Sequence, residues 1–267
     1  MICCASGVIM VRCANFNSLD GLRSDMAARR HRSENEQEVK IKLSKRDLEK
    51  VFNALSKKYG PGDIDHKYMP RAYWDTLRLD LDQHNISVRV QYKEGSDGDM
   101  GGHEQTVKLD LPHGNTLAKG AVLRREVKDI MPGHEPDLSI VTDAKTKPAL
   151  KPFLKKKLRH VFTAAIERRY FEVETGHGKH KGTVEIAFDL GEIVLPHNGR
   201  RYALCEIELE KKSGSKDAID KLRAHILEIA SSAKIQPLSK SQQGSRFFRR
   251  SISARHASRR RPPSRSL

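Results

Sequence analysis

The sequence predicts an α+β fold built mainly from antiparallel β-strands, with helices packed against the sheet. Runs in which apolar and charged residues alternate recur along the chain, and several are separated by turns rich in Gly, Asn, Asp or His. Few segments have the spacing of an amphipathic helix. The chain has 267 residues, 37% of them hydrophobic, which is enough for one domain with a real core.

The first predicted elements are a strand and a helix. The strand is ENEQEVKIKL, residues 34–43, in which every second residue is apolar from Val39 onward. The helix follows directly, because Ser44 and Asp47 resemble a capping box and the Gly60-Pro61 pair ends a helix.

Seven further strand-like runs follow: AYWDT, NISVRVQYK, HEQTVKLDL, AVLRREVKDI, RRYFEVETG, GTVEIAFDL and RYALCEIELE. Two more helices are expected, one around residues 149–159 and one from about Lys216 to Ala233, where Ile219, Leu222 and Ile226 form an apolar stripe.

Nearly every predicted strand has one face with charged residues. Basic residues dominate some strands and carboxylates dominate others. If the sheet closes into a barrel and helices cover its outside, the apolar positions face the helices and the charged positions line the interior. Unpaired buried charges cost several kcal/mol each, so such an interior needs paired charges or a ligand that neutralises them.

The run CEIELEKK places Glu206, Glu208 and Glu210 on one face of a strand. An isolated acidic row is more often a solvated face, but the basic faces of the other strands favour a binding site. Lysines and arginines suit a polyanion, and clustered carboxylates suit Mg²⁺ or Mn²⁺. Both requirements meet in a metal-complexed triphosphate. The sequence has no P-loop, HExxH or GxSxG motif.

Eight motifs in order resemble the CYTH superfamily of triphosphate tunnel metalloenzymes: EQEVK, YWDT, ISVRV, QTVKL, RREV, VEIAFDLGEI, CEIELEKKSG and a late LSK. The match runs from about Glu36 to Gly244 and is most similar to the bacterial inorganic triphosphatases. The resemblance implies an eight-stranded antiparallel β-barrel, a tunnel, with helices packed on the outside. It also implies metal-dependent cleavage of the terminal phosphoanhydride of inorganic triphosphate to pyrophosphate and phosphate.

The resemblance also implies the site residues, position by position. The catalytic residues would be Glu36, Glu38 and Lys40. The phosphates would contact Lys40, Arg89, Lys108, Arg124, Arg168 and Lys240, with Glu126 as a partner of the basic residues. The metal, Mg²⁺ or Mn²⁺, would be held by Glu36, Glu38, Glu185, Asp189, Glu206 and Glu208.

Several alternatives remain open at this point. Arg169 could take the place of Arg168, and the opening motif could be shifted to Glu38, Lys40 and Lys42. Gln91 and Gln243 stand where the family pattern has basic residues, which is compatible with a polyphosphate-binding module that does not turn over.

Other activities of the superfamily are also open: thiamine triphosphatase, nucleoside triphosphatase and class IV adenylate cyclase. Tyr73, Trp74 or Tyr92 could recognise a base in such an enzyme.

The two ends of the chain differ in composition from the predicted domain, residues 34–243. From Gly244 to Leu267 there are eight arginines and no acidic residue, and this accounts for half of the formal charge of +16. We expect this tail to be disordered and to contact nucleic acid non-specifically. Residues 1–33 are expected to be a disordered extension, or to precede a true start near Met26.

The positions of the cysteines and the hydropathy of the chain indicate in which cellular compartment the protein is expected. Three of the four cysteines lie within the first 13 residues, which argues against a disulfide framework and favours a reducing cytoplasm. No apolar run approaches the roughly 18 residues of a membrane span. We expect a cytoplasmic protein, a monomer or homodimer, with a small-molecule triphosphate substrate and no membrane partner.

Overall fold

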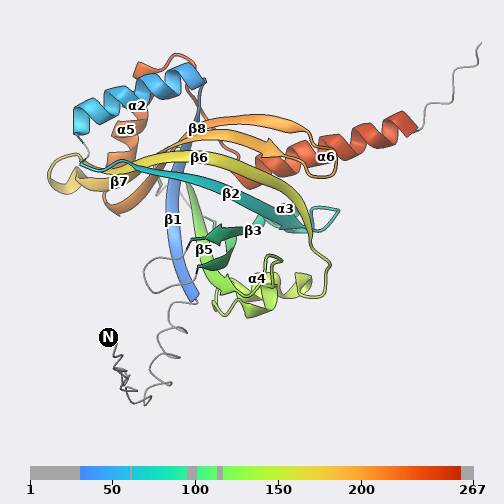
Figure 1. Cartoon of the computed structure of the whole chain (residues 1–267). Coiled ribbons are helices and arrows are strands. Elements are labelled where there is room, and N and C mark those ends of the chain that lie inside the picture. Colours follow the sequence, from blue (N-terminus) through green and yellow to red (C-terminus); the bar gives the residue numbers. More distant parts are fainter. Residues whose placement is uncertain (1–30, 61, 95–100, 113–116, 260–267) are drawn as a thin grey trace, which may run out of the picture.

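The computed structural model of the chain describes residues 31–60, 62–94, 101–112 and 117–259. Eight antiparallel strands form a closed barrel (Figure 1). They are β1 (His31–Lys42), β2 (Asp65–Asp75), β3 (Ile86–Lys93), β4 (Gly102–Asp110), β5 (Val122–Met131), β6 (Arg159–Thr175), β7 (Gly182–Val194) and β8 (Arg201–Gly214). The eight-stranded antiparallel barrel with outer helices, expected from the sequence, is confirmed.

Strand β1 closes the barrel. The strand order is β5-β4-β3-β2-β6-β7-β8-β1, and β1 also pairs with β5. The first part of β1, up to Glu38, pairs with β5, and the part from Glu38 to Lys42 pairs with β8. The two-residue strand β9 (Lys234–Ile235) adds to the outer end of β1. Because β1 contacts both partners, its inward side chains face β5 at one end of the tunnel and β8 at the other.

Three longer helices lie outside the barrel: α2 (Lys45–Tyr59), α5 (Asp217–Ile229) and α6 (Lys240–Arg259). Helix α2 forms as the sequence predicts, since the Ser44 side chain accepts a hydrogen bond from the Asp47 amide at 3.2 Å and Gly60 adopts a φ of 53° at the C-terminal end. Short elements are α3 (Asp80–Gln83), α4 (Lys147–Leu150) and the 3₁₀ turns Leu138–Ile140, Lys151–Phe153 and Gly178–His180. No helix in the described part of the chain is long and apolar enough to span a membrane.

The apolar core lies between the barrel wall and these helices. Helices α2 and α5 lie side by side against the barrel (Figure 1), and Leu48, Leu222 and Ile207 are in one buried cluster there. A second cluster includes Phe248 of α6 with Phe162 of β6, and a third joins β3, β4 and β5 to the segment around α4. The outward positions of the strands are therefore apolar, and the inward positions are left to the charged residues.

The predicted helix at residues 149–159 is wrong. Helix α4 ends at Leu150, a 3₁₀ turn covers Lys151–Phe153, and β6 begins at Arg159. Pro152 lies where a longer helix would need a backbone N–H donor, so the helix cannot continue. The helix predicted from about Lys216 is present as α5, but it ends at Ile229.

The expectation of a disordered tail from Gly244 is wrong for residues 244–259, which belong to α6. Phe248 is buried against the barrel, and Phe247 stacks on Tyr202 with ring centroids 3.9 Å apart. A Cβ atom on Gly244 would lie 2.2 Å from the Phe162 ring, so glycine allows the helix to approach. The expectation of a disordered extension over residues 1–33 is wrong for residues 31–33, which begin β1 and pair with β5. Residues 1–30 and 260–267 lie outside the described residues.

Candidate active site in the tunnel

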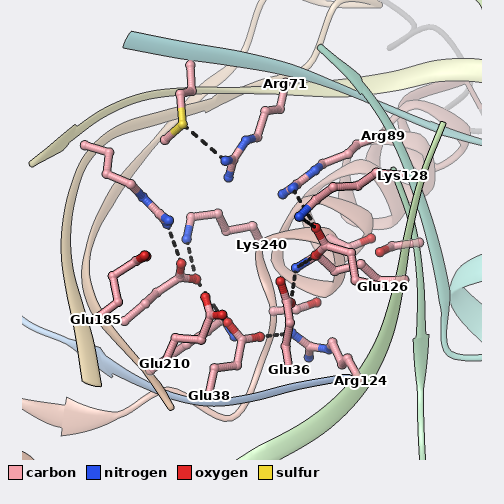
Figure 2. A pocket seen from close by; sticks show the side chains of 18 of the residues that line it. Glu36, Glu38, Arg71, Arg89, Arg124, Glu126, Lys128, Glu185, Glu210 and Lys240 are labelled. Atoms are coloured by element: carbon pink, nitrogen blue, oxygen red, sulfur yellow. Dashed lines mark hydrogen bonds and ion pairs between the residues drawn. The ribbon is translucent and has the colours of Figure 1, made fainter. Parts of the chain in front are cut away.

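The barrel encloses a cavity of about 350 Å³ lined by side chains from every strand of the barrel and from the start of α6. This volume is within the range of small-molecule sites. Eleven lysine and arginine side chains line it, against seven glutamates. Figure 2 shows these side chains pointing from the strands toward one another. The excess of positive charge suits a ligand with several negative charges.

The structure brings the predicted site residues together. Eleven of them line the cavity: Glu36, Glu38, Lys40, Arg89, Lys108, Arg124, Glu126, Arg168, Glu185, Glu208 and Lys240. The other two, Asp189 and Glu206, are buried and contact Lys240. Lys42, which belongs to the alternative register of the opening motif, is exposed, so the geometry favours the register Glu36, Glu38 and Lys40.

The choice between Arg168 and Arg169 follows from the phase of β6. Arg168 points into the tunnel, where Nε and Nη2 donate to the two carboxylate oxygens of Asp189 at 2.7 Å each. Arg169 points outward, where it pairs with Glu49 at 2.7 Å and lies 3.8 Å above the Phe52 ring. Arg168 is therefore the residue available to a ligand in the tunnel.

Lys240 joins three carboxylates from the middle of β7 and β8. Its Nζ lies 2.7 Å from Asp189, 2.6 Å from Glu206 and 2.7 Å from Glu208. Burial alone would raise the pKa of Glu208, but Lys240 and Arg168 hold it well below its usual range. Burial would lower the pKa of Lys240, yet the three carboxylates raise it above that of an ordinary lysine. Glu208 and Lys240 are thus both charged at neutral pH.

The same three carboxylates could hold a metal ion. One oxygen from each lies within 4.8 Å of the others. Carboxylate oxygens are the ligands that Mg²⁺ and Mn²⁺ prefer. The buried Oε1 of Glu206 has no hydrogen bond of good geometry, although Lys240 Nζ is close to it. The donor set therefore fits a divalent cation, which would compete with the Lys240 ammonium.

A second acidic group lies where β1 meets β5. Glu34, Glu36 and Glu126 also place oxygens within 4.8 Å of one another, and Lys108 contacts Glu36 at 2.5 Å. Burial raises the pKa of Glu36 to about 7 in spite of Lys108, and the nearby Glu126 adds to the rise. Burial would also raise the pKa of Glu126, but Lys108 and Arg89 hold it below its usual range. One carboxyl of this pair therefore binds a proton much more readily than the other.

The cavity has two chemically different walls. We call Lys67 and Arg71 of β2 with Arg89 and Lys93 of β3 the cationic wall, and Glu36, Glu38, Glu185, Glu208 and Glu210 the acidic wall. Figure 2 shows Arg71 and Arg89 on one side of the cavity and the labelled glutamates of the acidic wall on the other. The lining residues that β2 and β3 contribute include no acidic side chain.

Sequence reasoning missed half of the cationic wall. Lys67 and Arg71 were overlooked because the predicted strand began at Ala72, whereas β2 begins at Asp65. Pro70 concealed this start, since proline is uncommon inside strands. Counting back in steps of two from Tyr73, which lines the cavity, would have found both residues.

Five further charged lining residues are not in the predicted site set, although the alternation had already placed Glu210 on the face of Glu206 and Glu208: Glu34, Lys93, Lys128, Glu210 and Lys212. Two of them complete charge pairs with residues already identified. Lys128 lies 2.6 Å from Glu126, and Lys212 lies 2.9 Å from Glu185.

The two glutamines that depart from the family pattern take part in the network. Gln91 accepts a hydrogen bond from Arg71 at 3.0 Å and donates one to Glu104 at 2.9 Å. Gln243, on α6, donates to Glu206 at 3.2 Å. Each glutamine therefore orients a charged side chain of the tunnel.

Comparisons with known proteins agree with this architecture. A search of curated protein sequences finds no significant match. A Bacillus halodurans protein described as a candidate adenylate cyclase is similar in structure, with a TM-score of 0.50 and 19% identity, over 79% of this chain and 97% of that one. This likeness shows the fold alone.

Two more distant structures are a candidate adenylyl cyclase from Hippeastrum with a dominant triphosphatase activity and the triphosphatase of the Mimivirus capping enzyme. The first has a TM-score of 0.49 and 13% identity over 81% of this chain and 96% of that one. The second has a TM-score of 0.35 and 12% identity over 80% and 96%. A model of the CYTH domain matches residues 34–245, more than half of the chain. The chain therefore belongs to the CYTH domain family.

Proposed function

We propose that the protein is a metal-dependent hydrolase that cleaves the terminal phosphoanhydride bond of inorganic triphosphate to give pyrophosphate and phosphate. The observation that carries the proposal is the division of the tunnel into a cationic and an acidic wall. A phosphate chain would contact the cationic wall, and the acidic wall would hold Mg²⁺ or Mn²⁺ against its oxygens. A metal-complexed triphosphate is the small ligand that uses both walls.

The aromatic residues favour a substrate without a base. The described residues that line the cavity include two aromatic side chains, Tyr73 and Tyr170. Tyr73 is 6% exposed and stacks on Phe162, and the Tyr170 hydroxyl contacts Lys67. Trp74 packs near His160 and Tyr92 is 58% exposed, and both lie outside the described lining of this cavity. The tunnel therefore lacks a free aromatic face for a nucleoside or thiamine ring, among its described residues.

Catalysis by such a site would depend on orientation and charge neutralisation. Phosphoryl transfer has a loose transition state, so no nucleophilic side chain is required. Arg89 of the cationic wall, together with Lys40, Lys108 and Arg124, would hold the phosphate oxygens. Glu36, which faces the cavity beside Lys108, would orient the attacking water.

The metal would supply charge neutralisation at the phosphate oxygens. Its candidate ligands, implied by the family resemblance, are Glu36, Glu38, Glu185, Asp189, Glu206 and Glu208. The Asp189, Glu206 and Glu208 group is supported by its geometry. Glu185 has less support, because it is in neither group of clustered carboxylates and pairs with Lys212.

The test is phosphate release from tripolyphosphate, thiamine triphosphate, ATP and long-chain polyphosphate, each with Mg²⁺, Mn²⁺ or a chelator. We expect preference for tripolyphosphate and no release with chelator. Preference for ATP or thiamine triphosphate would instead support another activity of the family. Binding of tripolyphosphate without release from any substrate would support a polyphosphate-binding module.

A test of the expected contact between the basic tail and nucleic acid needs a truncation that keeps α6. Removing residues 244–267 would remove most of α6 and with it the packing that positions Lys240. Removal of residues 260–267, which include Arg260, Arg261 and Arg265, leaves the described helix intact. We expect this truncation to keep triphosphatase activity and to weaken RNA retention at low salt.

A further inference from the structure

We propose that Arg71 of β2 replaces the second basic residue that β3 lacks, and that its guanidinium binds a phosphate oxygen of the substrate in the tunnel. The inference rests on the proposed function, because the ligand is the anion named there. Gln91 occupies the β3 position where the family pattern has a basic side chain. Arg71, on the neighbouring strand, places a positive charge beside that position.

The sheet register makes Arg71 and Gln91 cross-strand neighbours. Ala72 pairs with Val90, so the next position along places Arg71 opposite Gln91 on the inward face. Arg71 Nε donates to Gln91 Oε1 at 3.0 Å. The Gln91 amide nitrogen donates to Glu104 at 2.9 Å, which turns the amide oxygen toward Arg71. Gln91 is therefore a positioning residue that holds the guanidinium in the orientation seen in Figure 2, pointing into the cavity.

Among the described residues, Arg71 is the one arginine of the cavity lining that forms no ion pair. It is 8% exposed, and its two described side-chain hydrogen-bond partners, the Gln91 oxygen and the Met69 sulfur at 3.2 Å, are neutral. In the described part of the chain no carboxylate lies within 4.0 Å of it. The other arginines of the lining each have one, and the longest of these pairs is Arg89 with Glu126 at 3.9 Å.

A buried charge without a partner is unfavourable, and an anionic ligand would supply the partner. The pKa of Arg71 reflects these unfavourable surroundings. Burial lowers the pKa of Arg71 to about 10, and repulsion from Arg89 and Arg168 contributes. Arg71 stays charged at neutral pH in an environment that disfavours the charge. A phosphate oxygen at this position would relieve the repulsion among three guanidinium groups.

The experiment moves the charge between the two strands. Tripolyphosphate binding is measured by calorimetry in chelator for the wild type, Arg71→Gln, Arg71→Lys and the double variant Arg71→Gln/Gln91→Arg. Arg169→Gln is the matched control, because Arg169 faces outward on β6. We expect Arg71→Gln to weaken binding by about 10- to 100-fold, as for loss of a charge-assisted hydrogen bond, and Arg71→Lys to weaken it less. The double variant should bind within about threefold of the wild type.

A structural role predicts a different pattern. If Arg71 only supports the fold, Arg71→Gln lowers the melting temperature, leaves the dissociation constant unchanged once folded, and is not rescued by Gln91→Arg. That result would overturn the inference. We expect instead an unchanged or higher melting temperature, because an uncompensated buried charge is removed.

Failure of the inference is distinguishable from failure of the proposed function. Wild-type hydrolysis of tripolyphosphate together with unchanged binding in Arg71→Gln would overturn the role of Arg71 alone. Binding that depends on Arg71 without any phosphate release would overturn the hydrolase proposal and keep the binding role. A wild type that does not bind tripolyphosphate would overturn both.

Discussion

The two walls of the tunnel follow the same strand periodicity, but they balance their charges differently. On the acidic wall, Glu208 lies 2.7 Å from Lys240 and Glu185 lies 2.9 Å from Lys212. On the cationic wall the shortest distances to a described carboxylate are 3.7 Å for Lys93 and 3.9 Å for Arg89. The protein thus neutralises its inward carboxylates internally and leaves its β2 and β3 cations for a ligand.

The largest expected effect is on stability. It tests whether Lys240 neutralises the carboxylates of the tunnel. Lys240→Met leaves Asp189, Glu206 and Glu208 without their common cation and should cost about 3–5 kcal/mol of unfolding free energy in chelator. Because a divalent cation fits the same oxygens, Mn²⁺ should restore part of the loss. Thermal unfolding with and without Mn²⁺ measures both. The exposed Lys181→Met is the control, and an equal melting temperature for both variants in chelator would contradict the assignment.

The next effect tests whether the walls have separate roles. Glu208→Gln should lower kcat by about 100-fold or more, by analogy with loss of a strong electrostatic stabiliser. It should keep the binding of metal-free tripolyphosphate, since the cationic wall is unchanged. Steady-state kinetics and calorimetry give the two values, with the exposed Glu174→Gln as control. Full metal-dependent activity in Glu208→Gln would refute its assignment as a ligand.

An ion pair on the outer face of β5 serves as a comparison, because its loss should change stability and leave catalysis unchanged. Arg125, next to the inward Arg124, binds Asp143 outside the tunnel and holds the pKa of that carboxyl below its usual range. Asp143→Asn should cost about 1.5–3 kcal/mol at pH 7. The stabilisation is present above the unfolded pKa of about 4 and is lost as the pH falls through the lower folded pKa.

The measurement is the melting temperature of wild type and Asp143→Asn between pH 7 and pH 3. The difference should shrink at the acidic end, and KM at pH 7 should be unchanged. A gap that widens with acid would show that the carboxylate is not held by Arg125 in its charged form.

The smallest effect concerns the edge of the cationic wall. The Lys93 side chain is 52% exposed, and water and salt screen its charge. Lys93→Gln should raise KM by no more than about fivefold, a change of about 0.2–1 kcal/mol, and the change should vanish at high salt. The KM values of Lys93→Gln and Arg71→Gln, measured at two ionic strengths, give the comparison. An effect as large as that of Arg71→Gln would remove the distinction between buried and exposed cations.

The barrel could be predicted because alternation along a strand is a local signal. Ile207 and Leu209 are fully buried outward positions, so Glu206 and Glu208 must face inward. The predictions that failed concern segments whose structure depends on contacts with residues far away in the sequence. The sequence around Phe247 is basic and poor in apolar residues, and its helix is stabilised by Tyr202 and the barrel surface. Arg71 was missed because the predicted strand began at Ala72, and the residues before it, which include Pro70, lack a clear strand pattern.

The closure of the barrel also has a consequence for how the chain reaches this structure. Strand β1 is the first described element, yet it pairs with β8, and Lys240 follows later still. Contacts between residues so far apart in sequence slow folding. During synthesis the tunnel can close only after β8 has left the ribosome, and the acidic cluster has Arg168 but not Lys240 as a partner until α6 emerges. We therefore expect newly made chains to gain their final stability in a single late step that requires the C-terminal helix.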